Sequence, residues 1–265
     1  MGRLLSQALV TWKAFSRLYG RLQDSSLSRL KIDPFVRKFG IAMEEFEDRP
    51  YRSFNDFFTR RFRTGSRTFV STTHHLPAFA EGRYLAFNSV DETTRYPVKG
   101  LRLRVGELLG STSQATPFLT GPLLIARLCP TDYHRFHYPD DGKTMDSWRI
   151  GGRLHSVNPV ALQSEPNILL RNERRVSILQ TKNFGKIAFV EIGALCVGKI
   201  VPTHADDKPF RRGDEKGYFL FGGSTVVILG ETGRWKPEAE LLKKTKEGLE
   251  TFFKLGEKVA SSTQP

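Results

Sequence analysis

Two histidines in the stretch ARLCPTDYHRFHYPDDG, residues 126–142, are the strongest candidates for acid and base chemistry. An apolar run leads directly into His134 and His137, and carboxylates stand on both sides of the pair, at Asp132, Asp140 and Asp141. Because an imidazole titrates near pH 6.5, it can both take up and return a proton at cellular pH. The pattern therefore favours general acid and base catalysis.

Two other interpretations of this pair are weaker. Histidines three positions apart can ligate a metal, but the stretch lacks the flanking ligands of the common zinc motifs, so no metal is expected. Either histidine alone could be a core residue with its hydrogen bonds satisfied. That interpretation is harder to hold for a pair enclosed by carboxylates.

A second stretch, FGGSTVVIL at residues 221–229, places Gly222 and Gly223 directly before Ser224 and Thr225. Glycine adopts positive φ freely, and the β-branched residues that follow suit a sheet. Residue types alone therefore predict a turn into a buried strand and nothing more.

The composition indicates a folded protein with an anionic partner. The chain has 265 residues, 39% of them hydrophobic, and a formal net charge of +13. That charge should draw it to nucleic acid or to anionic lipid. Cys129 and Cys196 lie far apart, each inside an apolar stretch, which favours buried thiols in a reducing compartment over a disulfide or a zinc site.

The N-terminal residues have the pattern of a basic amphipathic helix. Apolar side chains recur at helical spacing, with basic side chains mostly elsewhere around the helix: Leu5, Ala8, Leu9, Trp12, Phe15 and Tyr19, against Arg3, Lys13, Arg17 and Arg21. Such a helix can lie on anionic lipid or can pack against the protein's own core. No stretch approaches the roughly eighteen uncharged apolar residues of a membrane span.

These residues must be positioned by an α+β fold. Residues 1–63 are expected to form a helical, membrane-facing region, with breaks at Gly20, at Asp33-Pro34 and at Gly40 and with Ser53 as an N-cap. Residues 64–265 then show short β-branched runs between turn signals, which predict a mostly antiparallel β core, sandwich-like or barrel-like. PEAELLKKTKEGLE has the charge of an exposed helix, and ETFFKLGEKVA is expected to close the fold as a hairpin.

Several separated blocks together resemble the phosphatidylserine decarboxylase proenzymes, a family of pyruvoyl enzymes that make their own cofactor. The blocks stand in family order over residues 53–260: FNDFFTRRFRTGSR, VKGLRLRVGELLG, RLCPTDYHRFHYPDDG, SVNPVAL, NERRV, FVEIGALCVGKI, RGDEKGYFLFGGSTVV and ETFFKLGEKVA. The DYHRFH and GGST blocks are each moderately specific, and their joint occurrence is much more so.

The resemblance gives the FGGS stretch a chemical purpose. It implies that Ser224 cuts the bond after Gly223 and becomes a pyruvoyl group, which takes the place of pyridoxal phosphate in decarboxylation. It also implies that His137 is the base for Ser224, that His134 assists decarboxylation, and that Thr225 helps at the cleavage site.

At one position the chain departs from its family. The family usually has Asp-Gly where this chain has Glu81 before Gly82. A carboxylate at this position would orient His137, as in a catalytic triad. The extra methylene of Glu81 can displace that carboxylate by about 1 Å. The resemblance thus assigns Glu81 to the site, and self-cleavage is expected to depend on the length of the Glu81 side chain.

The expected reaction is the decarboxylation of phosphatidylserine to phosphatidylethanolamine and CO2. The implied partners are an anionic phospholipid membrane and a heterodimer of the chain's own two cleavage fragments, which can dimerise further, with no nucleic acid. The expected location is peripheral, at the cytoplasmic face of a bacterial cell membrane. Two alternatives stay open: a pyruvoyl decarboxylase of a soluble aromatic amino acid, and a non-processing relative that binds membranes.

Overall fold

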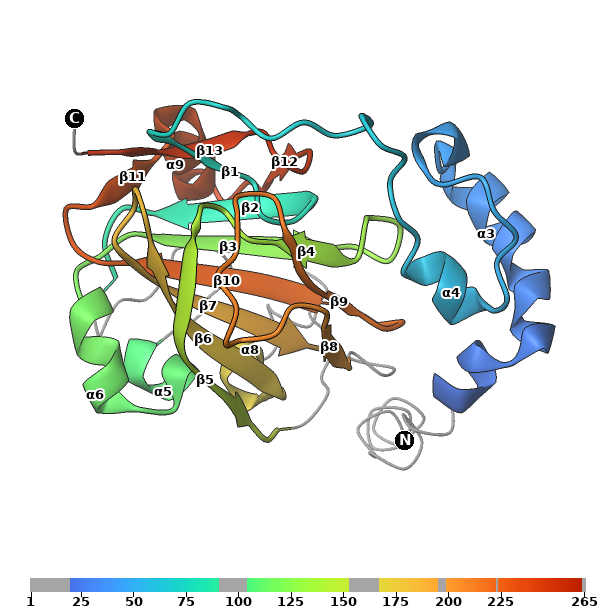
Figure 1. Ribbon diagram of the computed structural model, residues 1–265, viewed down its shortest axis with the longest axis horizontal. Coiled ribbons are helices and arrows are strands. Elements are labelled where there is room, and N and C mark those ends of the chain that lie inside the picture. Colours follow the sequence, from blue (N-terminus) through green and yellow to red (C-terminus); the bar gives the residue numbers. More distant parts are fainter. Residues whose placement is uncertain (1–19, 91–103, 153–166, 195–198, 223, 264–265) are drawn as a thin grey trace.

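A computed structural model describes residues 20–90, 104–152, 167–194, 199–222 and 224–263. The predicted amphipathic helix at the N-terminus lies outside these residues, apart from its last turn. Helices come first in the described chain and antiparallel strands follow, so the predicted α+β fold is confirmed (Figure 1). The strands form three open sheets, and no closed barrel exists among the described residues.

The N-terminal helices begin and end close to the predicted signals. They are η1 (Ser26–Lys31), α3 (Ile32–Phe39), η2 (Met43–Glu45) and α4 (Phe54–Phe58). Ser53 caps α4, because its hydroxyl accepts a hydrogen bond from the amide of Asp56 at 3.2 Å. Gly40 ends α3 with a φ of 60°, in the left-handed region that glycine adopts without strain.

Two predicted helix breaks are wrong. Gly20 is itself helical. Pro34 lies in the first turn of α3 rather than at a break, and there its missing amide proton costs no intrahelical hydrogen bond.

The largest sheet has seven strands in the order β12-β2-β3-β10-β7-β6-β5, and every pairing in it is antiparallel. Its strands are β2 (Gly82–Phe87), β3 (Leu123–Leu128), β5 (Gly142–Ile150), β6 (Arg174–Thr181), β7 (Lys186–Gly193), β10 (Ser224–Gly230) and β12 (Thr251–Phe253). Strand β10 is the middle strand, paired with β3 on one side and with β7 on the other.

Two smaller sheets complete the β core. One has the order β4-β9-β8 and the other β1-β13-β11. Their strands are β4 (Arg135–His137), β8 (Ile200–Pro202), β9 (Glu215–Phe219), β1 (His75–Pro77), β11 (Trp235–Pro237) and β13 (Lys258–Ser262). The segment predicted as a closing hairpin is not one. Strand β12 pairs with β2 and β13 with β1, because the chain turns at Gly256 into a different sheet.

The central sheet buries both of its faces. Val227 and Leu229 of β10 face a core shared with the helices α5 (Val105–Leu109), α6 (Thr112–Ala115), η3 (Thr116–Phe118) and α8 (Ile168–Arg171). Val226 and Ile228 face the opposite core, where side chains of β4, β9 and β13 meet those of α9 (Ala239–Lys246). Since side chains alternate along a strand, Ser224 lies on the same face as Val226.

The helical N-terminal region contacts the β core beside the start of β10. Phe54, Phe57 and Phe58 form a buried cluster with Ile32, and Phe221 packs against it. In Figure 1, α3 and α4 lie together at one end of the sheets. The division into a helical region up to residue 63 and a catalytic domain from residue 64 stays a prediction.

Candidate active site

Ser224 and His134 are in direct contact inside the protein. Ser224 begins β10 and is fully buried, and its Oγ lies 3.2 Å from Nδ1 of His134. The other ring nitrogen, Nε2, lies 3.0 Å from the carbonyl oxygen of Cys129. A carbonyl oxygen only accepts hydrogen bonds, so Nε2 carries the ring proton and Nδ1 is left to accept from the Ser224 hydroxyl. The ring nitrogen that faces Ser224 can therefore accept the hydroxyl proton, as a base for Ser224 must.

The surroundings of His134 keep its ring neutral. The ring of Phe58, from α4, stacks on the imidazole with the ring centroids 3.8 Å apart. Burial lowers the pKa of His134 to about 3, and the nearby Arg60 guanidinium acts in the same direction. The Nδ1 lone pair is thus available at neutral pH, although the ring is hard to protonate in this state.

The loop before His134 is shaped by Asp132. Its carboxylate accepts a hydrogen bond from the amide of Cys129 at 2.7 Å and forms an ion pair with Arg83 at 2.9 Å. Arg60, itself buried, donates to the carbonyl of Thr131 at 2.8 Å. These contacts hold the Cys129 carbonyl that sets the tautomer of His134.

His137 has different partners from those that the resemblance implied. Its Nδ1 donates to the carbonyl of Gly213 at 2.8 Å, and its Nε2 lies 3.3 Å from the hydroxyl of Tyr133. Burial lowers the pKa of His137 as well. The pairing of β4 with β9 has a register shift between Phe136 and His137. Ser224 therefore has His134 as its histidine neighbour here.

Glu81 binds an arginine from the segment between α4 and β1. Its carboxylate forms a two-pronged ion pair with Arg67, at 2.5 and 2.8 Å, and accepts from the amide of Leu255 at 3.0 Å. Arg67 also binds Glu45 at 2.7 Å. The Glu81 carboxylate, which was expected to lie behind His137, is bound to the guanidinium of Arg67 in this structure. A role of Glu81 in orienting His137 stays a prediction.

The residues around the expected cleavage bond are only partly described. Gly223 lies outside the described residues. Gly222 before it has a φ of 149°, a backbone conformation that L residues rarely adopt. The Thr225 hydroxyl oxygen is buried, with no hydrogen-bond partner among the described residues. Sequence patterns singled out Ser224 and both histidines, but they missed Phe58, whose aromatic helix gave no sign of a contact with His134.

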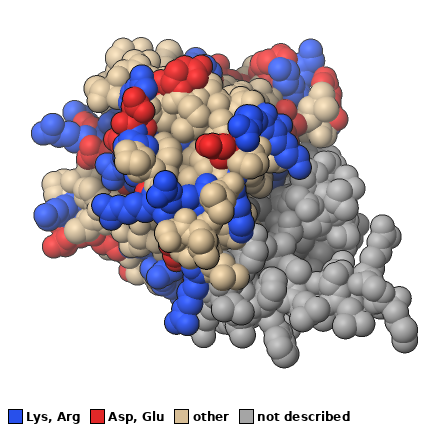
Figure 2. Space-filling model, turned by 90° about the vertical axis from the view of Figure 1, so that its right-hand side faces the viewer, with Lys and Arg blue, Asp and Glu red and all other residues tan. Residues whose placement is uncertain are grey.

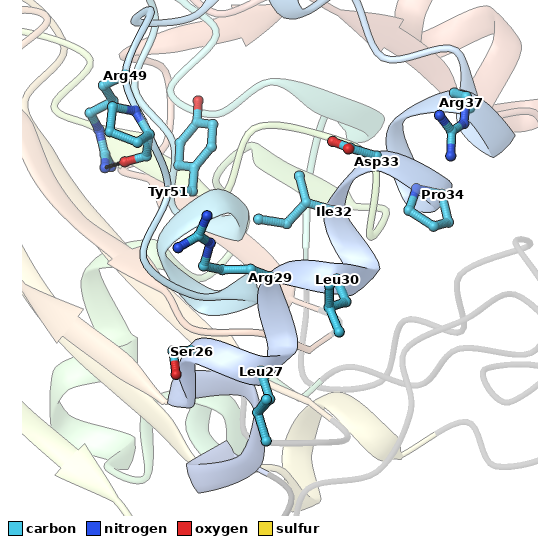
Figure 3. A pocket seen from close by; sticks show the side chains of 11 residues that line it. Ser26, Leu27, Arg29, Leu30, Ile32, Asp33, Pro34, Arg37, Arg49 and Tyr51 are labelled. Carbon is cyan, nitrogen blue, oxygen red and sulfur yellow. Dashed lines mark hydrogen bonds between the residues drawn. The ribbon is translucent and has the colours of Figure 1, made fainter.

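A groove on the helical region carries exposed leucines beside basic residues. It has a volume of about 700 Å³ and lies between η1, the start of α3 and the segment 49–51. Leu27 and Leu30 are 77% and 79% exposed and point away from the protein, whereas Arg29 points towards Tyr51 (Figure 3). Figure 2 views the molecule from this side and shows Lys and Arg side chains projecting from it among some acidic ones. This surface combines exposed apolar side chains with positive charge.

Comparison with known proteins identifies the family. The family model described as phosphatidylserine decarboxylase matches residues 54–261, which include His134, His137 and Ser224. The chain belongs to the phosphatidylserine decarboxylase family. The chain is a decarboxylase, as the description of the family and the names of its relatives indicate.

Individual members of the family match almost the whole chain. A phosphatidylserine decarboxylase proenzyme of Clostridium tetani is 42% identical over 93% of this chain and 84% of its own length. Proenzymes of Ruminiclostridium cellulolyticum and Clostridium beijerinckii are 39% and 37% identical, each over 98% of this chain and over 87% and 89% of their own lengths. The resemblance read from the sequence blocks is therefore confirmed.

The described residues offer neither a metal site nor a membrane-spanning helix. No group of three or more His, Cys, Asp or Glu side chains in the described parts of the chain could hold a metal ion. Every helix in those parts is too short or too polar to span a lipid bilayer.

Proposed function

We propose that this chain cuts itself between Gly223 and Ser224 and then decarboxylates phosphatidylserine to phosphatidylethanolamine and CO2. The observation that carries the proposal is the contact between Ser224 Oγ and the unprotonated Nδ1 of His134. It joins the GGST block to the DYHRFH block, which lie ninety positions apart in the sequence. The names of the relatives supply the substrate.

Self-cleavage begins with the Ser224 hydroxyl. Its Oγ attacks the Gly223 carbonyl carbon, the bond from that carbon to the Ser224 nitrogen breaks, and an ester replaces the amide. Loss of the Ser224 Cα proton then breaks the Cβ–Oγ bond, and Gly223 leaves as a carboxylate. The dehydroalanine that remains tautomerises, takes up one water and releases ammonia. Residue 224 is then a pyruvoyl group.

The geometry supports His134 as the base for the first step. Its Nδ1 is the ring nitrogen in contact with Oγ, and its Nε2 proton is held by the Cys129 carbonyl. For His137 to take the same proton, its ring would have to leave Tyr133 and Gly213. In this proposal His137 supports the loop that carries His134, and the family-based assignment of His137 as base becomes the competing outcome of the test.

The residues at the start of β10 fit a pyruvoyl group formed in place. Ser224 is fully buried, strands β3 and β7 pair with its backbone on both sides, and a neutral imidazole adjoins its side chain. When formed, the group supplies an electron sink for the bond that loses CO2. Nδ1 of His134, once it has itself taken up a proton, would deliver that proton to the substrate carbon after CO2 has left. Burial at this position excludes bulk water from the reacting atoms.

The exposed leucines and basic residues of η1 and α3 support a membrane partner. An apolar and positive surface suits the headgroup region of an anionic phospholipid membrane, where the substrate lies. We place the protein peripherally at the cytoplasmic face of the cell membrane, as a heterodimer of its two fragments that can dimerise further.

Intact mass measured under denaturing conditions tests the proposal. The purified protein should give a fragment ending at Gly223 and a fragment starting at residue 224 that is lighter, by one ammonia, than the same fragment starting with serine. Ser224→Ala should give a single full-length mass. A wild-type protein that stays at full length would support the non-processing alternative and overturn the proposal.

Assays with two substrate classes test the substrate. Phosphatidylserine in vesicles should release CO2, and free aromatic amino acids should not. CO2 release from aromatic amino acids alone would support the soluble-substrate alternative instead.

A further inference from the structure

Helix α4 of the N-terminal region reaches the turn that precedes the expected cleavage bond. The side-chain oxygen of Asn55 accepts a hydrogen bond from the backbone amide of Phe221 at 2.9 Å. The Phe221 ring packs edge-on against both Phe54 and Phe58, with ring centroids 5.2 and 5.0 Å apart. The segment leading into the GGST block is thus held by its backbone and by its side chain from the same helix.

The Asn55 amide is itself fixed in one orientation. Its nitrogen donates to the carboxylate of Asp24 at 2.7 Å, so its oxygen must point the other way, towards Phe221. Asn55 is buried, and its backbone carbonyl accepts hydrogen bonds from the amide and the hydroxyl of Thr59, each at 3.0 Å. Asp24 therefore sets the direction of an acceptor that lies more than thirty positions further along the chain.

A fixed turn matters for the attack on the Gly223 carbonyl. The Ser224 hydroxyl is held from one side by His134 and by the pairing of β10. On the other side, Gly222 has a positive φ, and a glycine-rich turn loses much conformational freedom when it is ordered. The hydrogen bond from the Phe221 amide to Asn55, one residue before Gly222, fixes a backbone position that glycines alone would not fix.

We infer that Asn55 is a positioning residue for self-cleavage. It holds the turn at Phe221 at a fixed position relative to Asp24 of the N-terminal helical region. The same helix places Phe58 on the ring of His134, so α4 holds both the attacked segment and the imidazole. This inference rests on the proposed self-cleavage.

The test is the rate at which the precursor disappears after a pulse of cell-free synthesis. Asn55→Leu has the same branched shape but removes both side-chain hydrogen bonds, to Asp24 and from Phe221. It should slow cleavage by about tenfold, which corresponds to about 1.4 kcal/mol for the lost Phe221 bond in the reacting arrangement. Asn55→Asp keeps the acceptor but faces the Asp24 carboxylate, so it should also cleave slowly. Asn55→Asp combined with Asp24→Asn reverses the donor and acceptor of that pair and should restore the rate.

Ser28→Ala is the matched control. The Ser28 hydroxyl accepts a hydrogen bond from the amide of Phe54 at 2.8 Å, so its loss weakens the anchoring of the same helix without touching the turn. Thermal unfolding is compared for all variants in a Ser224→Ala background. Ser28→Ala and Asn55→Leu should be destabilised to a similar degree. Of these two variants, only Asn55→Leu should cleave slowly.

Three outcomes separate the claims. Wild-type cleavage by Asn55→Leu would overturn the inference and leave the proposed function intact. Equal slowing by Ser28→Ala, or no restoration in the swapped double variant, would reduce Asn55 to a stabilising contact and also overturn the inference. A wild-type chain that never cleaves would instead overturn the proposed function.

Discussion

Nδ1 of His134 lies 3.2 Å from Oγ of Ser224, and Nε2 of the same ring is bound to the Cys129 carbonyl. One loop carbonyl therefore decides which nitrogen faces the serine. The arrangement gives the serine a proton acceptor without a carboxylate behind the imidazole, unlike the triad that the family resemblance suggested. The consequences of that difference can be measured.

Replacing each histidine in turn should separate their roles. His134→Ala removes the base from contact with Ser224, so the precursor should accumulate. His137→Ala leaves that contact in place and should slow cleavage only as far as it loosens the loop. The ratio of precursor to fragments on a denaturing gel after a fixed time measures both. A His134→Ala chain that cuts normally while His137→Ala stays whole would return the role of base to His137.

The stability of the precursor should fall as the pH falls below about 6.5. The unfolded chain takes up a proton at His134 near pH 6.5, whereas burial keeps the pKa of the folded ring at about 3. The unfolded state thus binds more protons between these values, and the stability present above pH 6.5 is lost on acidification. By pH 5 the loss from this group, relative to neutral and higher pH, is about 2 kcal/mol, and the slope approaches about 1.4 kcal/mol per pH unit.

Urea unfolding of a Ser224→Ala precursor checks this dependence. The lowered pKa of His137 adds to the slope in the same direction. Adding His134→Gln should make the slope between pH 5 and 6.5 shallower. If the slope stays unchanged with His134→Gln, the ring is already charged or exposed in the folded state.

Glu81→Gln separates an ion pair from a catalytic carboxylate. The neutral amide keeps an acceptor but loses the two-pronged ion pair with Arg67, which retains Glu45. We expect a loss of about 1–3 kcal/mol in the free energy of unfolding, with cleavage continuing in the molecules that fold. Chemical unfolding in the Ser224→Ala background and cleavage time courses in the active background give the two quantities. A fully stable but uncut Glu81→Gln protein would support the orienting role expected from the resemblance.

The leucines of η1 should contribute to vesicle binding. Leu27→Asp combined with Leu30→Asp places charge on an exposed apolar surface, so binding to vesicles that contain phosphatidylserine should weaken by at least about tenfold. Leu249→Asp is the control, because Leu249 is also exposed and follows α9, a helix that lies at the other end of the molecule from α3 (Figure 1). Vesicle sedimentation at low and high salt measures binding. Equal binding by the double variant and the control would remove this surface from the interface.

Local signals predicted local structure well. Ser53 and Gly40 stand at the ends of their helices because capping depends on a few neighbouring residues. The β-branched run after Ser224 became a strand because its alternate side chains face two separate cores. The fold class and the two chemical blocks could therefore be predicted from the sequence.

Contacts between distant segments could not be predicted in the same way. Glu81 pairs with Arg67, whose position depends on how the N-terminal region packs. His134 rather than His137 faces Ser224 because of the Cys129 carbonyl and the Phe58 ring. The last strands were predicted as a hairpin because they are neighbours in sequence, but the positive φ of Gly256 sends the chain to another sheet.

The burial of Ser224 bears on the kind of chain end that this fold can accept. Ordinary hydrolysis of the bond before it would leave a positively charged amino terminus at a fully buried position of the middle strand. Such an unpaired charge would cost several kcal/mol in an apolar interior. The proposed reaction releases that nitrogen as ammonia and leaves a neutral ketone. The new chain end can therefore stay inside the sheet, closed to aminopeptidases and to reagents that label amines.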